Sequence, residues 1–120
     1  MSISKCIWID NGGLVTKMGL SLNNTLVFGE NKQKVDIEYK KFGSEIYLLF
    51  TWQKTTGRYP SHIFKCPDNP RFEDGMEIEW CDVEIPGIKN HKKTRSRKRV
   101  IKIIDSSWFN KLWTNFENEE

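Results

Sequence analysis

Hydrophobic and polar residues alternate along much of this chain with a period of two, which is typical of β-strands. In segment 35–40 every second residue is apolar and the residues between are charged, which predicts a strand with one buried face. Segment 45–52 is apolar on both faces, which predicts a strand at the centre of a sheet. Segment 14–22 fits either a strand or a short helical turn. Shorter apolar runs predict further strands at 6–9, 25–28, 62–66 and 100–104.

Segment 76–85 changes the parity of its apolar positions halfway along. A β-bulge at Cys81-Asp82 would return both apolar sets to one core, because one added residue reverses which face each later side chain occupies. The outward side chains would then form an acidic stripe along the strand. The first apolar set is Met76, Ile78 and Trp80, the second is Val83 and Ile85, and the acidic stripe is Glu77, Glu79, Asp82 and Glu84.

The last apolar segment has the period of a helix. Trp108, Leu112, Trp113 and Phe116 share one helical face, and Asp105 or Ser106 can accept a first-turn N–H as the N-cap. The chain is 12% aromatic, enough to form a folded core. We therefore predict one domain over residues 1–120, of the α+β class and mostly β. Its architecture would be a bent antiparallel sheet or small barrel with one C-terminal helix.

Composition also indicates where the protein works. Three cysteines without a paired spacing fit a reducing compartment, and no apolar run approaches the roughly 20 residues that span a bilayer. The first residues lack a secretory pattern, so we expect a cytoplasmic protein without membrane partners, or a nuclear one if the source is eukaryotic. Ala is absent while Ile, Lys and Asn are abundant, which suggests an AT-rich genome such as that of a phage, a virus or a low-GC bacterium.

Positive charge is concentrated in the eleven residues from Lys89 to Arg99, here called the basic tract, of which seven are Lys or Arg. The whole chain has 19 basic and 16 acidic residues, so without the tract 12 basic residues face 16 acidic ones. No acidic residue lies between Ile85 and Ile104. Because the tract connects two apolar strands, we predict a flexible basic loop at 86–99. Segregated charge of this kind usually contacts a polyanion.

The leading hypothesis is a small non-enzymatic nucleic-acid-binding protein that contacts DNA or RNA phosphates through this loop. Trp52, Tyr59 and Phe72 are candidates for stacking on bases, although packing under the loops is the favoured alternative for them. Other readings of the tract are a solvated loop, a nuclear import signal, or a strap that pairs with the acidic stripe. The expected nucleic-acid-binding residues are Lys89, Lys92, Lys93, Arg95, Arg97, Lys98 and Arg99 of the tract, with Lys54 and Arg58.

Two other functions stay open. The two-signed surface would suit a protein-binding effector or inhibitor, of the phage or viral host-takeover type, that docks on a host protein or an acidic partner. A metal-dependent nuclease would need clustered carboxylates, for which Asp36, Glu38 and Lys40 share a strand face, with Asp10 or Glu30 as further partners. An amphipathic strand produces that spacing by chance, and no catalytic triad is indicated. The sequence does not predict an oligomeric state.

A zinc site is also considered. His62, Cys66, Cys81 and His91 are the types of residue that bind zinc, but no Cys-x2-Cys pair accompanies them. We therefore expect Cys66 and Cys81 to be buried as small apolar groups, and we expect neither a metal nor a cofactor.

Overall fold

The computed structural model describes residues 4–10, 13–92 and 98–119 as nine strands and one helix. The elements are β1 (Ser4–Asp10), β2 (Val15–Leu20), β3 (Leu26–Phe28), β4 (Gln33–Phe42), β5 (Glu45–Lys54), β6 (Gly57–Arg58), β7 (His62–Lys65), β8 (Glu77–Glu79), β9 (Arg99–Ile103) and α1 (Ser106–Asn118). Segment 14–22, which the pattern left open, is the strand β2 with its flanking turns.

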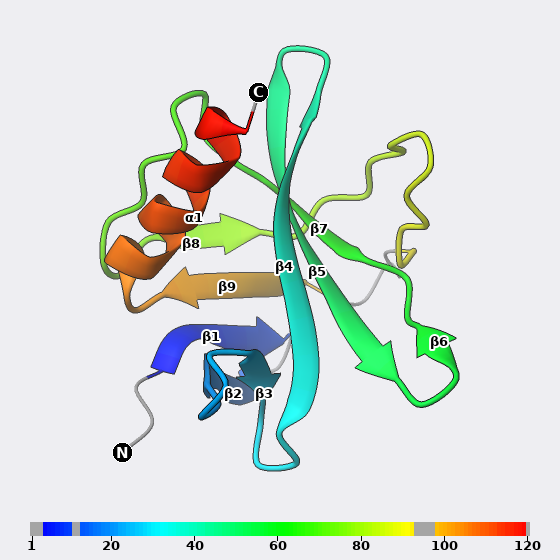
Figure 1. Cartoon of the computed structure of the whole chain (residues 1–120), viewed down its shortest axis with the longest axis vertical. Coiled ribbons are helices and arrows are strands. Elements are labelled where there is room, and N and C mark those ends of the chain that lie inside the picture. Colours follow the sequence, from blue (N-terminus) through cyan, green and yellow to red (C-terminus); the bar gives the residue numbers. More distant parts are fainter. Residues whose placement is uncertain (1–3, 11–12, 93–97, 120) are drawn as a thin grey trace.

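The strands form one curled antiparallel sheet (Figure 1). The strand order is β6-β5-β4-β3-β2-β1-β9-β8, and β7 also pairs with β5. The first five strands form a meander, and β9 returns from far along the sequence to pair with β1. An isolated bridge between Phe64 and Trp80 brings β7 to the end of β8, so the sheet curls into a half-barrel. The predicted fold class is confirmed: a mostly β, bent antiparallel sheet with one C-terminal helix.

The main hydrophobic core lies on the concave side of the sheet, where large side chains from distant strands meet. Phe50 of β5, Phe64 of β7 and Ile101 of β9 are all fully buried there. Alternate residues of each strand face this core, as the period of two predicted. In β9 the same alternation carries Arg99 inward together with Ile101 and Ile103.

The helix α1 begins as the sequence indicated, because the Asp105 side chain accepts a hydrogen bond from the Trp108 N–H at 3.3 Å. Phe109 and Trp113 are its buried residues, and the helix packs against β4. The Tyr39 hydroxyl of β4 donates to the Phe109 carbonyl at 3.0 Å. The sequence pattern therefore placed the helix correctly but omitted Phe109, its most buried side chain.

The predicted β-bulge in segment 76–85 is wrong. The strand β8 ends at Glu79, after which the Trp80 N–H donates to Arg99 of β9 and the Cys81 N–H donates to Ile63 of β7. The chain thus steps from one edge of the sheet to the other, and Ile85 packs on the opposite face of β5 and β7 in a second apolar cluster. The change in parity marks a crossing between two apolar faces. The four acidic residues of the predicted stripe are exposed, as expected.

Candidate nucleic-acid interface

The first part of the basic tract is attached to the sheet. The Ser61 N–H donates to the Lys89 carbonyl and the His91 N–H donates to the Ser61 carbonyl, both at 2.8 Å, so residues 89–91 run parallel to the chain at Ser61. The Asn90 side chain adds hydrogen bonds to Val83 and Asp82. These contacts leave Lys89 and Lys92 exposed beside β7. The start of the predicted loop therefore has a defined position.

The remaining tract residues differ in where they lie. Lys98 is exposed, whereas Lys93, Arg95 and Arg97 lie outside the residues that the structure describes. Arg99 begins β9 and is only 7% exposed, so it belongs to the interior and not to the surface of the loop. The prediction that Arg99 faces a phosphate from the loop therefore does not fit its position.

Arg99 lies between aromatic rings and a carboxylate. Its guanidinium carbon is 4.9 Å from the centroid of the Trp80 ring and 5.8 Å from that of Trp8, and its Nε is 3.4 Å from an Asp10 oxygen. The Trp8 indole N–H donates to the same Asp10 oxygen at 3.1 Å. Stacking and charge pairing together hold a planar cation at this position.

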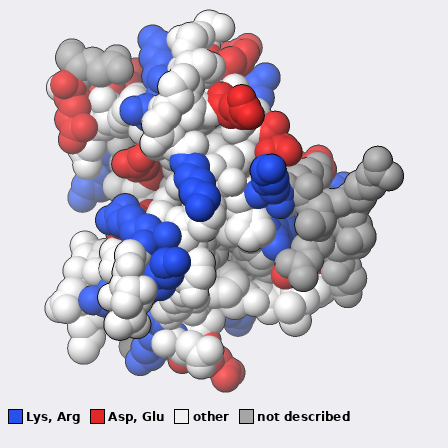
Figure 2. Space-filling model, turned by 90° about the vertical axis from the view of Figure 1, so that its right-hand side faces the viewer, with Lys and Arg blue, Asp and Glu red and all other residues white. Residues whose placement is uncertain are grey.

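Two further predicted cations lie on the short hairpin of β5 and β6, both exposed. The Lys54 ammonium is 5.1 Å from the centroid of the Tyr59 ring. Arg58 forms an ion pair with Asp36, which also accepts a hydrogen bond from Gln53 at 2.9 Å. This hairpin and residues 89–92 of the tract lie on the side of the molecule that faces the viewer in Figure 2, where Lys and Arg side chains stand among uncharged and acidic residues.

A shallow pocket of about 260 Å³ lies among these cationic segments. Its lining comes from β4, β5, β7, β9, the tract and the segment after β6. The residues are Gln33, Trp52, Tyr59, His62, His91 and Arg99. All of these except Gln33 were candidate residues in the sequence, but for separate roles as stacking rings, metal ligands or phosphate contacts. The parallel run of residues 89–91 beside β7 is what brings His91 over His62.

The two histidines of the pocket are stacked, with ring centroids 4.7 Å apart and an angle of 20° between the planes. Burial, the positive charge of Arg99 and the neighbouring His91 together lower the pKa of His62 to about 3. His62 is therefore a neutral imidazole at physiological pH. Its ring also meets Trp52 edge-on at 4.7 Å, which makes the pocket floor aromatic.

The lowered pKa of His62 predicts a loss of stability in mild acid. The unfolded chain takes up a proton near the ordinary value of 6.5 and the folded chain only near 3, so stability falls as the pH drops between these values. The expected slope is at most about 1.4 kcal/mol per pH unit. Urea denaturation at pH 7.0, 6.0 and 5.0 measures this dependence above the range in which most carboxylates titrate.

The matched variants are His62→Phe and His91→Phe. We expect the first to lose most of the pH dependence and the second to keep most of it, because burial is the largest cause of the lowered pKa of His62. If His62→Phe unfolds with the same dependence on pH as the wild type, His62 is not the group responsible.

The three aromatic candidates for base stacking have different positions. Trp52 and Phe72 are 7% and 3% exposed, so they pack in the core, as the favoured alternative anticipated. Tyr59 is 45% exposed and lies on the rim of the pocket. Of the three, Tyr59 alone offers a large ring surface to a ligand from outside.

The zinc and nuclease candidates are not assembled by the fold. Cys66 packs in the main core, whereas Cys81 packs against the second apolar cluster. Burial raises the pKa of Cys66 to about 12, which disfavours the thiolate that zinc requires. Within the described ranges, no three His, Cys, Asp or Glu side chains are close enough to share a metal ion. Asp36 is occupied by Arg58 and Gln53.

The acidic stripe does not neutralise the described part of the tract. Across residues 4–10, 13–92 and 98–119, no ion pair joins Lys89, Lys92 or Lys98 to the stripe. The stripe meets the tract at the Asn90 amide, which donates to Asp82 at 3.2 Å. These three lysines therefore remain open to an external anion.

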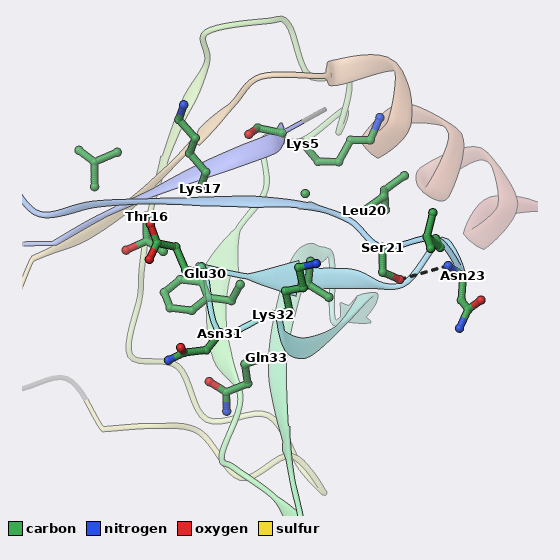
Figure 3. A pocket seen from close by; sticks show the side chains of 17 residues that line it. Lys5, Thr16, Lys17, Leu20, Ser21, Asn23, Glu30, Asn31, Lys32 and Gln33 are labelled. Atoms are coloured by element: carbon green, nitrogen blue, oxygen red, sulfur yellow. Dashed lines mark hydrogen bonds between the residues drawn. The ribbon is translucent and has the colours of Figure 1, made fainter. Parts of the chain in front are cut away.

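A second, wider groove runs along β2, β3 and their turns (Figure 3). It combines Lys17, Lys32 and Glu30 with the apolar Leu20 and Val27. None of the buried polar atoms that lack a partner in the described part of the chain belongs to a residue of this groove. It therefore lacks the buried, unpartnered polar group that distinguishes the pocket at His62.

Comparison of the chain with protein-family models, with curated proteins and with solved structures found no match. In the part of the chain that the structure describes, no helix has the length and hydrophobicity needed to cross a bilayer.

Proposed function

We propose that this protein binds nucleic acid without catalysis, through the basic tract and the neighbouring β5–β6 hairpin. The observation that carries the proposal is the position of the tract relative to the pocket. His91 and Arg99, near the two ends of the tract, both line the aromatic pocket. The exposed Lys92 directly follows His91, and the exposed Lys98 directly precedes Arg99. Cations beside an aromatic pocket are the combination used to hold phosphates and bases together.

The tract can supply substantial affinity at low salt. Six of its seven cations remain as phosphate contacts once the buried Arg99 is set aside: Lys89, Lys92, Lys93, Arg95, Arg97 and Lys98. Each neutralised phosphate releases condensed counterions, which contributes about −0.9 to the slope of log affinity against log salt for duplex DNA, or about −0.7 for single strands. The buried Arg99 instead fixes the start of β9, and it forms part of the pocket wall through its contacts with Trp8, Trp80 and Asp10.

A charge-neutralised variant tests the proposal. Lys92, Lys93, Arg95, Arg97 and Lys98 are all replaced by Gln, and Arg99 is kept because its removal would disturb buried contacts. We expect the magnitude of the salt slope to fall by up to about 4.5 for duplex DNA, with affinity at 0.1 M salt weakened at least a hundredfold. Fluorescence anisotropy with duplex DNA, single-stranded DNA and RNA at several salt concentrations measures both quantities.

The matched control removes the same charge elsewhere. Lys17, Lys34, Lys40, Lys41 and Lys111 are exposed and lie outside both the tract and the β5–β6 hairpin, and their replacement by Gln changes net charge equally. This control is expected to weaken binding only slightly and to keep most of the slope. An equal loss in both variants would show a general charge effect and would exclude the tract as the contact.

A second candidate function is docking on a protein, as an effector or inhibitor. It is favoured by three exposed apolar side chains around β2, where Leu14 is 65%, Val15 52% and Leu22 106% exposed. Exposed apolar residues beside lysines suit charge-steered protein pairing. Capture of a partner from host extract that survives nuclease treatment and is lost in Leu14→Ser/Leu22→Ser would support this function. Capture that ends with nuclease treatment would exclude it.

A further inference from the structure

The pocket at His62 is small and lined by rings. Its volume of about 260 Å³ lies below the roughly 300–1,000 Å³ of pockets for drug-sized ligands, so it suits one small ring system. Tyr59 forms an exposed part of the rim, and the half-buried His91 lies flat against His62. Trp52 closes the floor edge-on to His62. These surfaces are suited to a flat, polarisable ligand.

The polar groups of the pocket point to a ligand with hydrogen-bonding edges. His62 is 9% exposed, and its Nδ1 is buried with no hydrogen-bond partner among the described residues. A buried polar atom of this kind costs free energy until something bonds to it. Gln33 also lines the pocket, and because its amide nitrogen donates to the Gln53 carbonyl at 3.4 Å, its amide oxygen is left as an acceptor.

The local charge balance favours a neutral ligand. The Arg99 guanidinium is paired with Asp10, and Arg58 beside the pocket is paired with Asp36. A phosphate near the pocket would therefore find each of these two guanidinium groups already paired with a carboxylate. The exposed lysines of the tract and Lys54 take no part in these two ion pairs, so they can contact phosphates. The pocket is therefore close to neutral, while the surface around it is positively charged.

We propose that this pocket takes one unpaired nucleobase from single-stranded nucleic acid. The base stacks on Tyr59 and presents its polar edge to Gln33 and to the wall formed by His62 and His91, while the exposed Lys92 and Lys98 hold the adjacent phosphates. The inference rests on the proposed function and narrows it from nucleic acid in general to strands with an accessible base. Duplex DNA, whose bases are stacked and paired, fills only the phosphate contacts.

Oligonucleotides that separate bases from phosphates test the pocket. The first is a 12-nucleotide strand of abasic deoxyribose phosphates, and four others carry one central A, C, G or T in the same strand. At least one of the four is expected to bind at least fivefold more tightly than the abasic strand, because stacking on an aromatic side chain contributes about 1–3 kcal/mol per base. The salt slope should be the same for all five strands, since their phosphates are identical.

Three variants locate the base. Tyr59→Ala and His91→Ala are expected to reduce the gain in affinity from the central base, and Tyr59→Phe, which keeps the ring, is expected to retain it. Phe42→Ala is the matched control, because Phe42 is an aromatic residue of nearly equal exposure, 44% against 45% for Tyr59, at the distant β4–β5 turn. This control should leave unchanged both the gain in affinity from the central base and the slope of log affinity against log salt.

The outcomes separate the two proposals. Equal affinity for the abasic strand and all four base-bearing strands overturns the base pocket and leaves phosphate binding by the tract in place. A gain that survives in both Tyr59→Ala and His91→Ala also overturns the pocket assignment. Failure of the protein to bind any of these strands or duplex DNA, even at 20 mM salt, overturns the proposed function and the base pocket together.

Discussion

Replacement of Phe109 by alanine is expected to lower the free energy of unfolding by about 3–5 kcal/mol, the usual loss for a large aromatic side chain in a packed core. Phe109 is fully buried, and its ring meets Phe72 edge-on at 6.0 Å, which ties the helix to the segment before β8. The substitution would therefore leave a cavity between α1 and the concave face of the sheet. Urea denaturation followed by tryptophan fluorescence measures the change.

Phe116 provides the matched comparison for this prediction. It is another phenylalanine on the same helix, where it is partly buried beside Trp113 at 5.5 Å between ring centroids. Replacing it by alanine is expected to cost about 1–2 kcal/mol, because less apolar surface returns to water. Equal losses at the two positions would contradict the placement of Phe109 as the main anchor of the helix.

Removing the charge of Asp105 is expected to lower the free energy of unfolding by about 2–3 kcal/mol. The Lys5 ammonium lies 2.6 Å from an Asp105 oxygen, and the Lys5 side chain is 10% exposed against 27% for Asp105. Asp105→Asn keeps a side-chain acceptor for the helix N-terminus but leaves the Lys5 cation without its counter-charge. The partial exposure of Asp105 keeps the expected loss below that for a fully buried pair.

A double variant separates the ion pair from the helix cap. In Asp105→Asn/Lys5→Met the unpaired cation is gone, and an apolar side chain of similar length fills its place. We expect most of the lost stability to return, because replacing both members of a buried pair is usually close to neutral. A double variant no more stable than Asp105→Asn alone would contradict this account of the pair.

The pH dependence of this pair has a defined sign. The hydrogen bonds from Lys5 and Ser107 hold the pKa of Asp105 below its ordinary value. The stabilisation is therefore complete at neutral pH and is lost as the pH falls through the lowered pKa. This loss occurs at lower pH than the onset of the His62 effect, so the two contributions can be separated by titration.

Periodicity predicted the elements well because each depends on residues close in sequence. The alternation in 35–40 and the apolar run in 45–52 became β4 and β5. The same alternation also indicated that Arg99 is buried. Arg99 lies two residues before Ile101 and four before Ile103, so its side chain is on the same face of β9 and is buried with theirs. Charge type alone assigned Arg99 to the surface. Its strand position was the better indicator of where it lies.

The candidate site was predictable only in part. The concentration of charge singled out the tract, and Lys54 and Arg58 were predicted to bind with it. Burial was the favoured prediction for Tyr59, whose side chain is 45% exposed. The pocket could not be derived, because its residues are separated by up to 66 positions, from Gln33 to Arg99. His62 and His91 were considered only as metal ligands. Composition shows which side chains are available, but it does not show that these two imidazole rings stack on each other.

By itself, the sequence determined the types of the local elements, the mostly β class and the separation of a cationic tract from a weakly acidic body. Hydrophobic period and charge are properties of neighbouring residues, so they can be read without a fold. Tertiary structure alone decided that the chain crosses the sheet after Trp80, that Arg99 turns inward, and that His91 covers His62. Those outcomes depend on strand register and on contacts across the half-barrel, where the packing of distant side chains overrides local preference.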